Sequence, residues 1–91
     1  MWVVYIIQSE KDKSYYIGCT NNIIERILEH NSGHSKYTSR KMPWVLRYLE
    51  NVKDLKEARK REAFLKRQRN RKFYDKLINA QLVTPSTRGD C

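Results

Sequence analysis

Two runs of β-branched and aromatic residues at the start of the chain constrain its fold more than any other feature. Residues 2–7 and residues 15–18 have the composition of short strands, and residues 9–14 between them are entirely polar. Two apolar runs joined by a short polar segment are typical of adjacent antiparallel strands. The sequence therefore predicts a hairpin.

The hairpin also predicts which side chains lie together, because successive side chains of a strand point to opposite faces. Val3, Tyr5 and Ile7 share one face, and Tyr16 and Gly18 on the second strand lie across from them. Both tyrosines are ordinary core aromatics by default, and their phenols matter chemically only if they point into one cleft. The glycine either allows a close approach or merely relieves steric crowding.

The remainder of the chain alternates between helical and extended patterns. Asn22 followed by Glu25 has the spacing of a capping box, and apolar residues then recur at helical spacing. A chain of 91 residues closes one core, so we expect a single α+β domain of order ββαβαα over residues 1–78. The elements expected after the hairpin are a helix over about 22–31, a basic loop over 34–43, a strand over 44–50, a helix over about 53–68, a short helix over 70–78 and a flexible tail over 79–91.

The charge of the chain indicates a polyanionic partner. There are 19 Lys and Arg against 10 Asp and Glu, a formal net charge of +9. Such a field attracts nucleic acid, because the bound protein releases condensed counterions. Basic surfaces also serve solubility and contact with anionic membranes, and charge alone does not separate these roles.

Ten of the basic residues lie between residues 53 and 72, among only three acidic ones. This surplus of basic over acidic residues is larger than solubility or i,i+4 pairing needs, so it favours a phosphate-binding surface over a solvated helix face. The side chains expected to bind nucleic acid are Lys36, Arg40 and Lys41 in the basic loop and Lys60, Lys66 and Arg67 in the helix region.

The compartment is predicted from two further features. Residues 1–8 are apolar, but they have no basic leader or small-residue cleavage site and are too few to span a bilayer. The two cysteines, Cys19 and Cys91, belong to no CxxC pair or zinc array. We expect a cytoplasmic protein with reduced thiols, no membrane contact and no structural zinc.

Glu62 stands where the pattern of its helix asks for an apolar side chain. At about 100° per residue it falls on the stripe formed by Leu55, Ala58 and Leu65. A carboxylate so placed needs a partner, which could be an arginine in a structural ion pair or a divalent cation. The spacing leaves both alternatives open.

Arg26 and His30 are four residues apart and share one edge of the first expected helix. A guanidinium held there could clamp a phosphate and stabilise the charge that develops on it. The imidazole could accept a proton near neutral pH. The structural alternatives are a salt bridge for the arginine and a capping or packing role for the histidine.

Several short motifs follow one another in a specific order. Val3-Val4-Tyr5 and Tyr16-Ile17-Gly18 precede Arg26, His30-Asn31-Ser32-Gly33, and Glu57-Ala58 leading to Glu62. Together they resemble a GIY-YIG domain of the nuclease superfamily, from residue 1 to about residue 78. The chain is most similar to the small stand-alone bacterial members.

The resemblance implies a three-stranded antiparallel sheet flanked by helices, in agreement with the order ββαβαα. It also implies a metal-dependent endonuclease that hydrolyses phosphodiester bonds in nucleic acid, and we expect DNA rather than RNA as the substrate, although no sequence feature separates the two. The roles it implies are water activation for Tyr16, support in the cleft for Tyr5, phosphate stabilisation for Arg26, proton transfer for His30, and ligation of one divalent cation, Mg²⁺ or Mn²⁺, for Glu62 alone.

The chain departs from the family pattern at two places. Val3-Val4 replaces the Gly-Ile of the first signature, and Cys19 stands where repair-type relatives can carry a lysine, which would remove a cationic contact. The alternative function is a nucleic-acid-binding module that cuts slowly or not at all, and a third is a basic adaptor. A larger protein partner could supply the specificity that no recognisable base-reading element provides.

Overall fold

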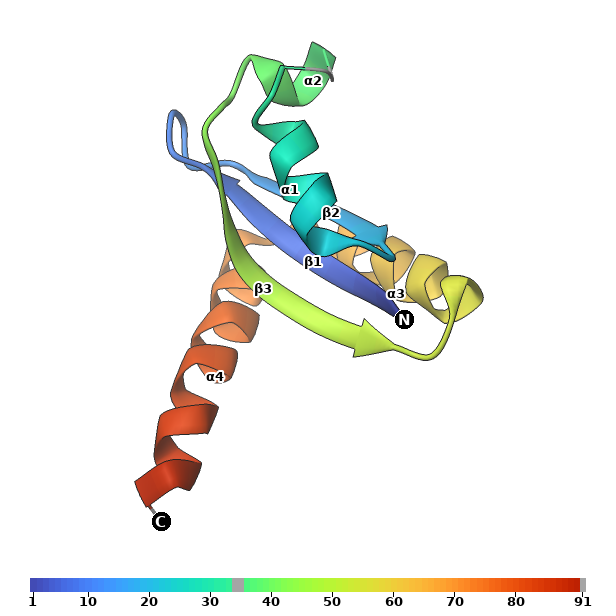
Figure 1. Cartoon of the computed structure of the whole chain (residues 1–91). Helices are drawn as coiled ribbons and strands as arrows, with labels where there is room; N and C mark the ends of the chain where they lie inside the picture. Colours follow the sequence, from blue (N-terminus) through green and yellow to red (C-terminus); the bar gives the residue numbers. More distant parts are fainter. Residues whose placement is uncertain (34–35, 91) are drawn as a thin grey trace.

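The computed structural model of the chain describes residues 1–33 and 36–90, with side chains described as far as residue 81. Its core is a three-stranded antiparallel sheet with helices on both faces (Figure 1). The predicted α+β class is therefore confirmed. The elements are β1 (Trp2–Ser9), β2 (Tyr15–Thr20), α1 (Ile23–His30), α2 (Lys36–Ser39), β3 (Trp44–Val52), α3 (Leu55–Gln68) and α4 (Arg71–Asp90).

The sheet has the strand order β2-β1-β3, so β2 and β3 are its edges. In the hairpin, Tyr5 pairs with Gly18 and Ile7 pairs with Tyr16. This register is the one that places the two tyrosines on one face, as the alternation of apolar residues predicted. β1 pairs with β3 along its whole length, with one irregularity between Ile6 and Ile7.

The two faces of β1 bury different side chains, because alternate residues point in opposite directions. α1 lies over one face and α3 over the other, as Figure 1 shows. On the α1 face the buried cluster is Tyr5, Ile7 and Trp44. On the face that carries α3 and α4 the larger cluster is Val4, Ile6, Ile17, Tyr48, Ala58, Leu65, Tyr74 and Ile78.

Helices α1 and α3 each begin at a side-chain cap. The Asn22 side chain accepts a hydrogen bond from the backbone N–H of Glu25 at 3.1 Å, which is one half of the predicted capping box. The backbone N–H of Asn22 donates to the Thr20 hydroxyl instead of to Glu25. Asp54 caps α3 in the same way, through the N–H of Glu57 at 2.9 Å. These caps fix where α1 and α3 start, and so fix which of their residues face the sheet.

The segment predicted as a basic loop contains a single helical turn, α2, and residues 34 and 35 of that loop lie outside the described residues. The indole N–H of Trp44 donates to the backbone carbonyl of Thr38 at 2.8 Å. This contact anchors the turn against the start of β3. Local sequence carries no sign of it, because the tryptophan lies in the next element.

α4 is longer than the helix expected over residues 70–78, since it runs Arg71–Asp90. The amide of Gln81 accepts from the backbone N–H of Leu49 at 3.2 Å and donates to its carbonyl at 2.6 Å. The helix therefore satisfies backbone groups on the outer edge of β3, which would otherwise be open to pairing. The flexibility of residues 79–91 stays a prediction.

Within residues 1–33 and 36–90 there is no helix that combines the length and the apolar character needed to cross a bilayer.

Candidate active site

The side chain of Tyr5 lies directly over Gly18. A Cβ atom at residue 18 would lie 2.5 Å from the Tyr5 hydroxyl oxygen, and Cβ atoms in proteins essentially never approach another heavy atom that closely. The tyrosine is only 1% exposed, so its ring has little room to move aside. Of the two roles considered for the glycine, the close approach is therefore the one that the structure supports.

The Tyr5 hydroxyl joins two side chains of α1. It lies 3.0 Å from Nε2 of His30 and accepts a hydrogen bond from Nε of Arg26 at 3.3 Å. A second nitrogen of the arginine lies 2.9 Å from the carboxylate of Glu29, three residues along the same helix. The salt bridge expected as a structural alternative for Arg26 therefore exists, and it leaves the guanidinium in contact with the tyrosine.

Burial sets the protonation states within this group. Removal from water raises the pKa of Tyr5 to about 12, although the Arg26 hydrogen bond opposes the shift, so the phenol is neutral at pH 7. Hydrogen bonds to Tyr5 and Glu29 raise the pKa of Arg26, which keeps its charge. Burial and the arginine charge lower the pKa of His30, so that the imidazole is neutral.

His30 is more enclosed than its expected role in proton transfer requires. It is only 2% exposed, and among the described residues no group hydrogen-bonds its Nδ1. The Tyr16 ring lies against it at 5.0 Å between centroids, and Trp44 lies at 6.4 Å. A packing and positioning role fits this burial better than direct contact with a solvent molecule.

Tyr16 differs from Tyr5 in the state of its hydroxyl group. The ring is half-buried against His30, Trp44 and Tyr37. Within the part of the chain that the structure describes, no residue hydrogen-bonds its hydroxyl. Tyr16 is therefore the tyrosine whose oxygen is free to contact a bound water molecule or substrate.

Glu62 lies on α3 between the buried residues Ala58 and Leu65, as its position on the apolar stripe predicted. Its side chain is 21% exposed, and its carboxylate lies 2.8 Å from Nζ of Lys66. The ion pair is with a neighbouring lysine, so the arginine partner considered from the sequence is not the one found among the described residues. The lysine of this pair is half-exposed, so solvent screens the interaction and the pair contributes little to stability.

The carboxylate of Glu62 opens onto a cavity of about 420 Å³, lined also by Cys19, Arg59, Ala63 and Lys66. Burial, reinforced by a hydrogen bond to the glutamate, raises the pKa of the Cys19 thiol to about 11, so the free cysteine stays protonated. The negative charge of Glu62 also contributes to the raised pKa of Tyr5.

The fit of this site to a metal ion follows from its donors. Among the described side chains, those of residues 1–33 and 36–81, no cluster of three or more His, Cys, Asp or Glu occurs, so a cation at Glu62 would have at most two such protein ligands. Mg²⁺ suits such a site, because it retains several water molecules and binds one or two carboxylates together with substrate phosphates. The donor set therefore fits the predicted cation, provided that Lys66 moves aside.

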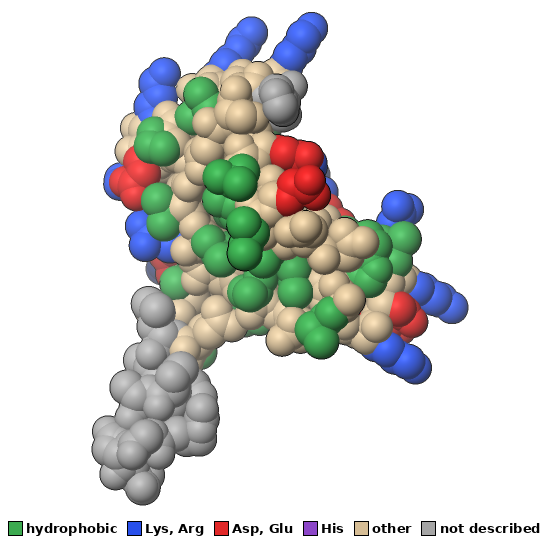
Figure 2. All heavy atoms as spheres, viewed as in Figure 1, with side chains coloured by type: hydrophobic (Ala, Val, Ile, Leu, Met, Phe, Trp, Pro, Cys, Tyr) green, Lys and Arg blue, Asp and Glu red, His purple; other side chains and the backbone are tan. Residues whose placement is uncertain are grey.

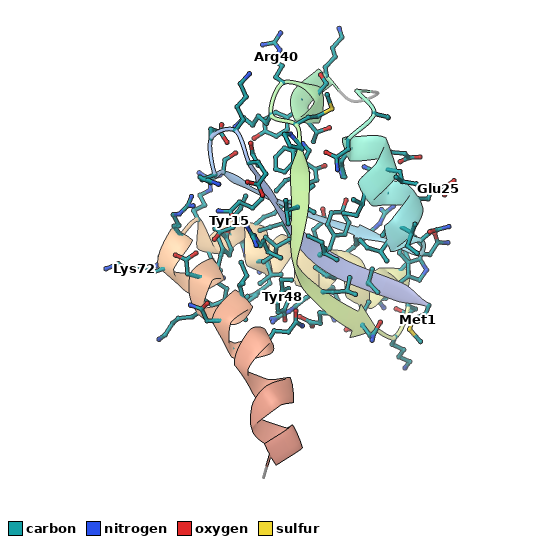
Figure 3. The ribbon with its side chains drawn as sticks, turned by 60° about the vertical axis from the view of Figure 1, so that its left-hand side comes forward. Met1, Tyr15, Glu25, Arg40, Tyr48 and Lys72 are labelled. Atoms are coloured by element: carbon teal, nitrogen blue, oxygen red, sulfur yellow. The ribbon has the colours of Figure 1, made fainter. Side chains whose placement is uncertain are left out.

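The six basic residues expected to bind nucleic acid fall in two groups. Lys36, Arg40 and Lys41 lie at the α2 end of the molecule, where Figure 3 shows Arg40 pointing away from the body. Lys60, Lys66 and Arg67 lie on α3 and are exposed. In Figure 2 the Lys and Arg side chains stand at the periphery, while the face over α1 is largely apolar and acidic.

Two residues of the site were absent from the sequence interpretation. Glu29 holds Arg26, and its i,i+3 spacing was a signal that could have been used. Tyr37 packs beside Tyr16 with 6.0 Å between ring centroids. Nothing in its own segment indicated this contact, which depends on how α2 folds over the hairpin.

The neutral state of His30 predicts an acid-sensitive stability. Its pKa is lowered on folding, so below pH 6.5 the unfolded chain binds more protons, and stability falls with falling pH. We expect the melting temperature of the parent to drop by a few degrees between pH 7.5 and pH 5.5, and that of His30→Gln to drop less. Equal drops in thermal melts of the two proteins would show that the histidine is not buried in its neutral form.

Comparisons with known proteins identify the family of the chain. A family described as the GIY-YIG catalytic domain matches residues 1–75. A UPF0213 protein of Desulfotalea psychrophila is 45% identical over 67 residues, which cover 71% of this chain and 60% of that protein. A UPF0213 protein of Bacillus cereus is 45% identical over 69 residues, covering 75% of this chain and 70% of its own length. One of Clostridium perfringens is 44% identical over 82 residues, covering 88% and 85%. No solved structure gives a significant match.

Proposed function

Because this chain belongs to the GIY-YIG family of catalytic domains, we propose that it is a metal-dependent endonuclease that hydrolyses phosphodiester bonds in DNA. The observation that carries the proposal is the contact of Tyr5 with both Arg26 and His30, with the free hydroxyl of Tyr16 beside them. A charged arginine that is held in place beside an available phenol is an arrangement suited to phosphoryl chemistry.

Arg26 is proposed to bind the scissile phosphate. Its guanidinium is held by Tyr5 on one side and Glu29 on the other, so its orientation is set before the substrate arrives. Donors fixed in advance stabilise charge that develops on a phosphate without the cost of reorganising in the transition state. Tyr5 and His30 are then positioning residues.

Tyr16 is proposed to activate the attacking water molecule. Its oxygen accepts a proton from the water as its own phenolic proton passes to solvent, and the new P–O bond forms. The bond to the leaving oxygen breaks, and this oxygen takes up a proton from solvent. A divalent cation at Glu62, Mg²⁺ or Mn²⁺, would supply Lewis-acid stabilisation of the charge on the phosphate. Lys66, the present partner of the carboxylate, would then be free to approach a phosphate.

The test is a cleavage panel. Purified protein is incubated with duplex, flap, junction and single-stranded DNA and RNA, with Mg²⁺, with Mn²⁺ and with chelator. Cleavage of a DNA substrate that requires the cation supports the proposal. Binding without cleavage under every condition would favour a nucleic-acid-binding module instead. The cytoplasm as the compartment and a larger protein partner stay predictions.

The basic residues of α3 predict a salt-dependent interaction. Replacing Lys60, Lys66 and Arg67 by glutamine should weaken binding to all sequences alike and flatten the slope of log affinity against log salt by about one unit per lost phosphate contact. The control variant has glutamine at Lys53, Lys56 and Lys72. These side chains are also exposed, and replacing them removes the same total charge. Each variant is titrated with nucleic acid at several salt concentrations. If both variants match the parent in affinity and in salt dependence, the interface lies elsewhere.

A further inference from the structure

A second cavity, of about 430 Å³, borders the site at β2, the edge strand that pairs with β1 alone. Its walls are unusually rich in aromatic side chains. The lining residues are Tyr15, Tyr16, Ile17, Tyr37, Lys66 and Tyr74. Tyr16 and Lys66 also belong to the candidate active site, so whatever occupies this cavity lies next to the reacting phosphate.

One wall of the cavity is fixed in place. The hydroxyl of Tyr74 donates to the backbone carbonyl of Leu65 at 2.6 Å, and that of Tyr15 donates to the carboxylate of Asp75. The two rings meet edge to face at 5.8 Å between centroids. Figure 3 shows Tyr15 beside the start of α4, which carries its partner. These two tyrosines are occupied in holding the fold.

The other wall presents Tyr37, whose ring the fold covers only in part, through Tyr16 and Lys41. Tyr37 is 54% exposed, although it sits beside Tyr16, which is itself half-buried. A purely structural aromatic at this place would be expected to bury its ring, because each exposed Å² of apolar surface forgoes about 25 cal/mol. The exposed ring is therefore available for a flat, apolar group of a ligand.

Cations surround the aromatic walls. Nζ of Lys41 lies 5.1 Å from the centre of the Tyr37 ring, and Cζ of Arg71 lies 4.7 Å from that of Tyr15. Lys66 stands in the wall itself. Aromatic faces that alternate with cations form the type of surface that binds unpaired nucleotides, since the bases stack on the rings and the phosphates meet the charges.

We propose that this cavity binds one unpaired nucleobase of the substrate, stacked on Tyr37, with Lys41, Lys66 and Arg71 facing the neighbouring phosphates. The inference rests on the proposed nuclease function and gives it a substrate class, namely strands with an unpaired nucleotide next to the cleaved phosphate. A base inside a duplex cannot enter, because both of its faces are already stacked.

The experiment measures binding by fluorescence anisotropy, in chelator so that no strand is cut. The probes are a labelled twelve-nucleotide thymidine strand and a blunt duplex of the same length. Tyr37→Ala should weaken binding of the single strand about five- to hundredfold and change duplex binding less than twofold. Tyr37→Phe keeps the ring and should bind as the parent does. Phe64→Ala is the matched control, since this exposed ring on α3 also has a cation over it, Arg61.

A set of strands that each lack one base locates the contact. At one position the missing base should make parent and Tyr37→Ala bind equally, because the ring then has nothing to stack on. If Tyr37→Ala binds both probes as the parent does, or weakens both alike, the base subsite is overturned. The parent is also incubated with the same strands and Mn²⁺. If the parent cleaves them, the nuclease proposal holds even when the base subsite is overturned. If the parent neither binds nor cleaves them, the nuclease proposal itself has failed.

Discussion

Replacing Glu62 by glutamine should reduce metal-dependent cleavage by about 10³-fold or more while leaving a folded protein that still binds nucleic acid. The amide keeps the volume of the side chain but removes the charge that offsets a divalent cation. Loss of several kcal/mol of charge stabilisation corresponds to this rate factor. Binding should persist or tighten, because one negative charge facing the phosphates is gone.

The partner of Glu62 makes this result informative. The carboxylate pairs with an exposed lysine, and such pairs contribute about 0–1 kcal/mol to the free energy of unfolding. A loss of activity in this variant is therefore not explained by unfolding. Melting temperature, Mn²⁺ affinity and cleavage rate, measured on one preparation, test the assignment.

Glu57→Gln is the matched control for Glu62→Gln. It makes the same change on the same helix, and Glu57 also pairs with a lysine, Lys60, at 3.9 Å. We expect this variant to bind Mn²⁺ and to cleave as the parent does. If Glu62→Gln also cleaves at the parental rate, the carboxylate serves only its ion pair and the metal-ligand role is wrong.

Much of the fold could be predicted because its signals are local. The composition of two short strands and a polar turn predicted the hairpin, and the period of two in a strand placed Tyr5 and Tyr16 on one face. The capping pair Asn22 and Glu25 gave the start of α1. Each of these features depends on residues that are close in the sequence or directly paired.

The parts that escaped prediction depend on contacts between distant elements. His30 was placed on a helix edge by its spacing, but the register of α1 against the sheet buries it under Tyr16. The partner of Glu62 depends on rotamers at the helix surface, where a lysine four residues away competes with any arginine. Tyr37 reaches the site only because α2 folds over the hairpin.

Tyr16→Phe is expected to lower the cleavage rate by about 10²–10⁴-fold, the range typical of losing a group that handles a proton. Its hydroxyl has no hydrogen-bond partner among the described residues, so its removal should leave the melting temperature nearly unchanged. The ring remains to pack on His30. Cleavage rates under single-turnover conditions report the chemical step without the contribution of product release.

Tyr15→Phe provides the matched control one residue away on the same strand. It removes the same hydroxyl, but that group donates to Asp75 on the opposite face of the sheet. Loss of a hydrogen bond to a carboxylate costs about 1.5–3 kcal/mol, so this variant should melt earlier and yet cleave normally. The two variants therefore distinguish a hydroxyl group that serves catalysis, on Tyr16, from one that serves stability, on Tyr15.

The comparison with His30→Gln decides which group receives the proton of the attacking water. The imidazole is buried and neutral, and its contact with Tyr5 orients Arg26 indirectly, so its loss should slow cleavage less than the loss of the Tyr16 hydroxyl. If His30→Gln were inactive while folded and Tyr16→Phe cleaved at the parental rate, the histidine would be the base. The order of the two rates thus distinguishes a positioning residue from the group that touches the water.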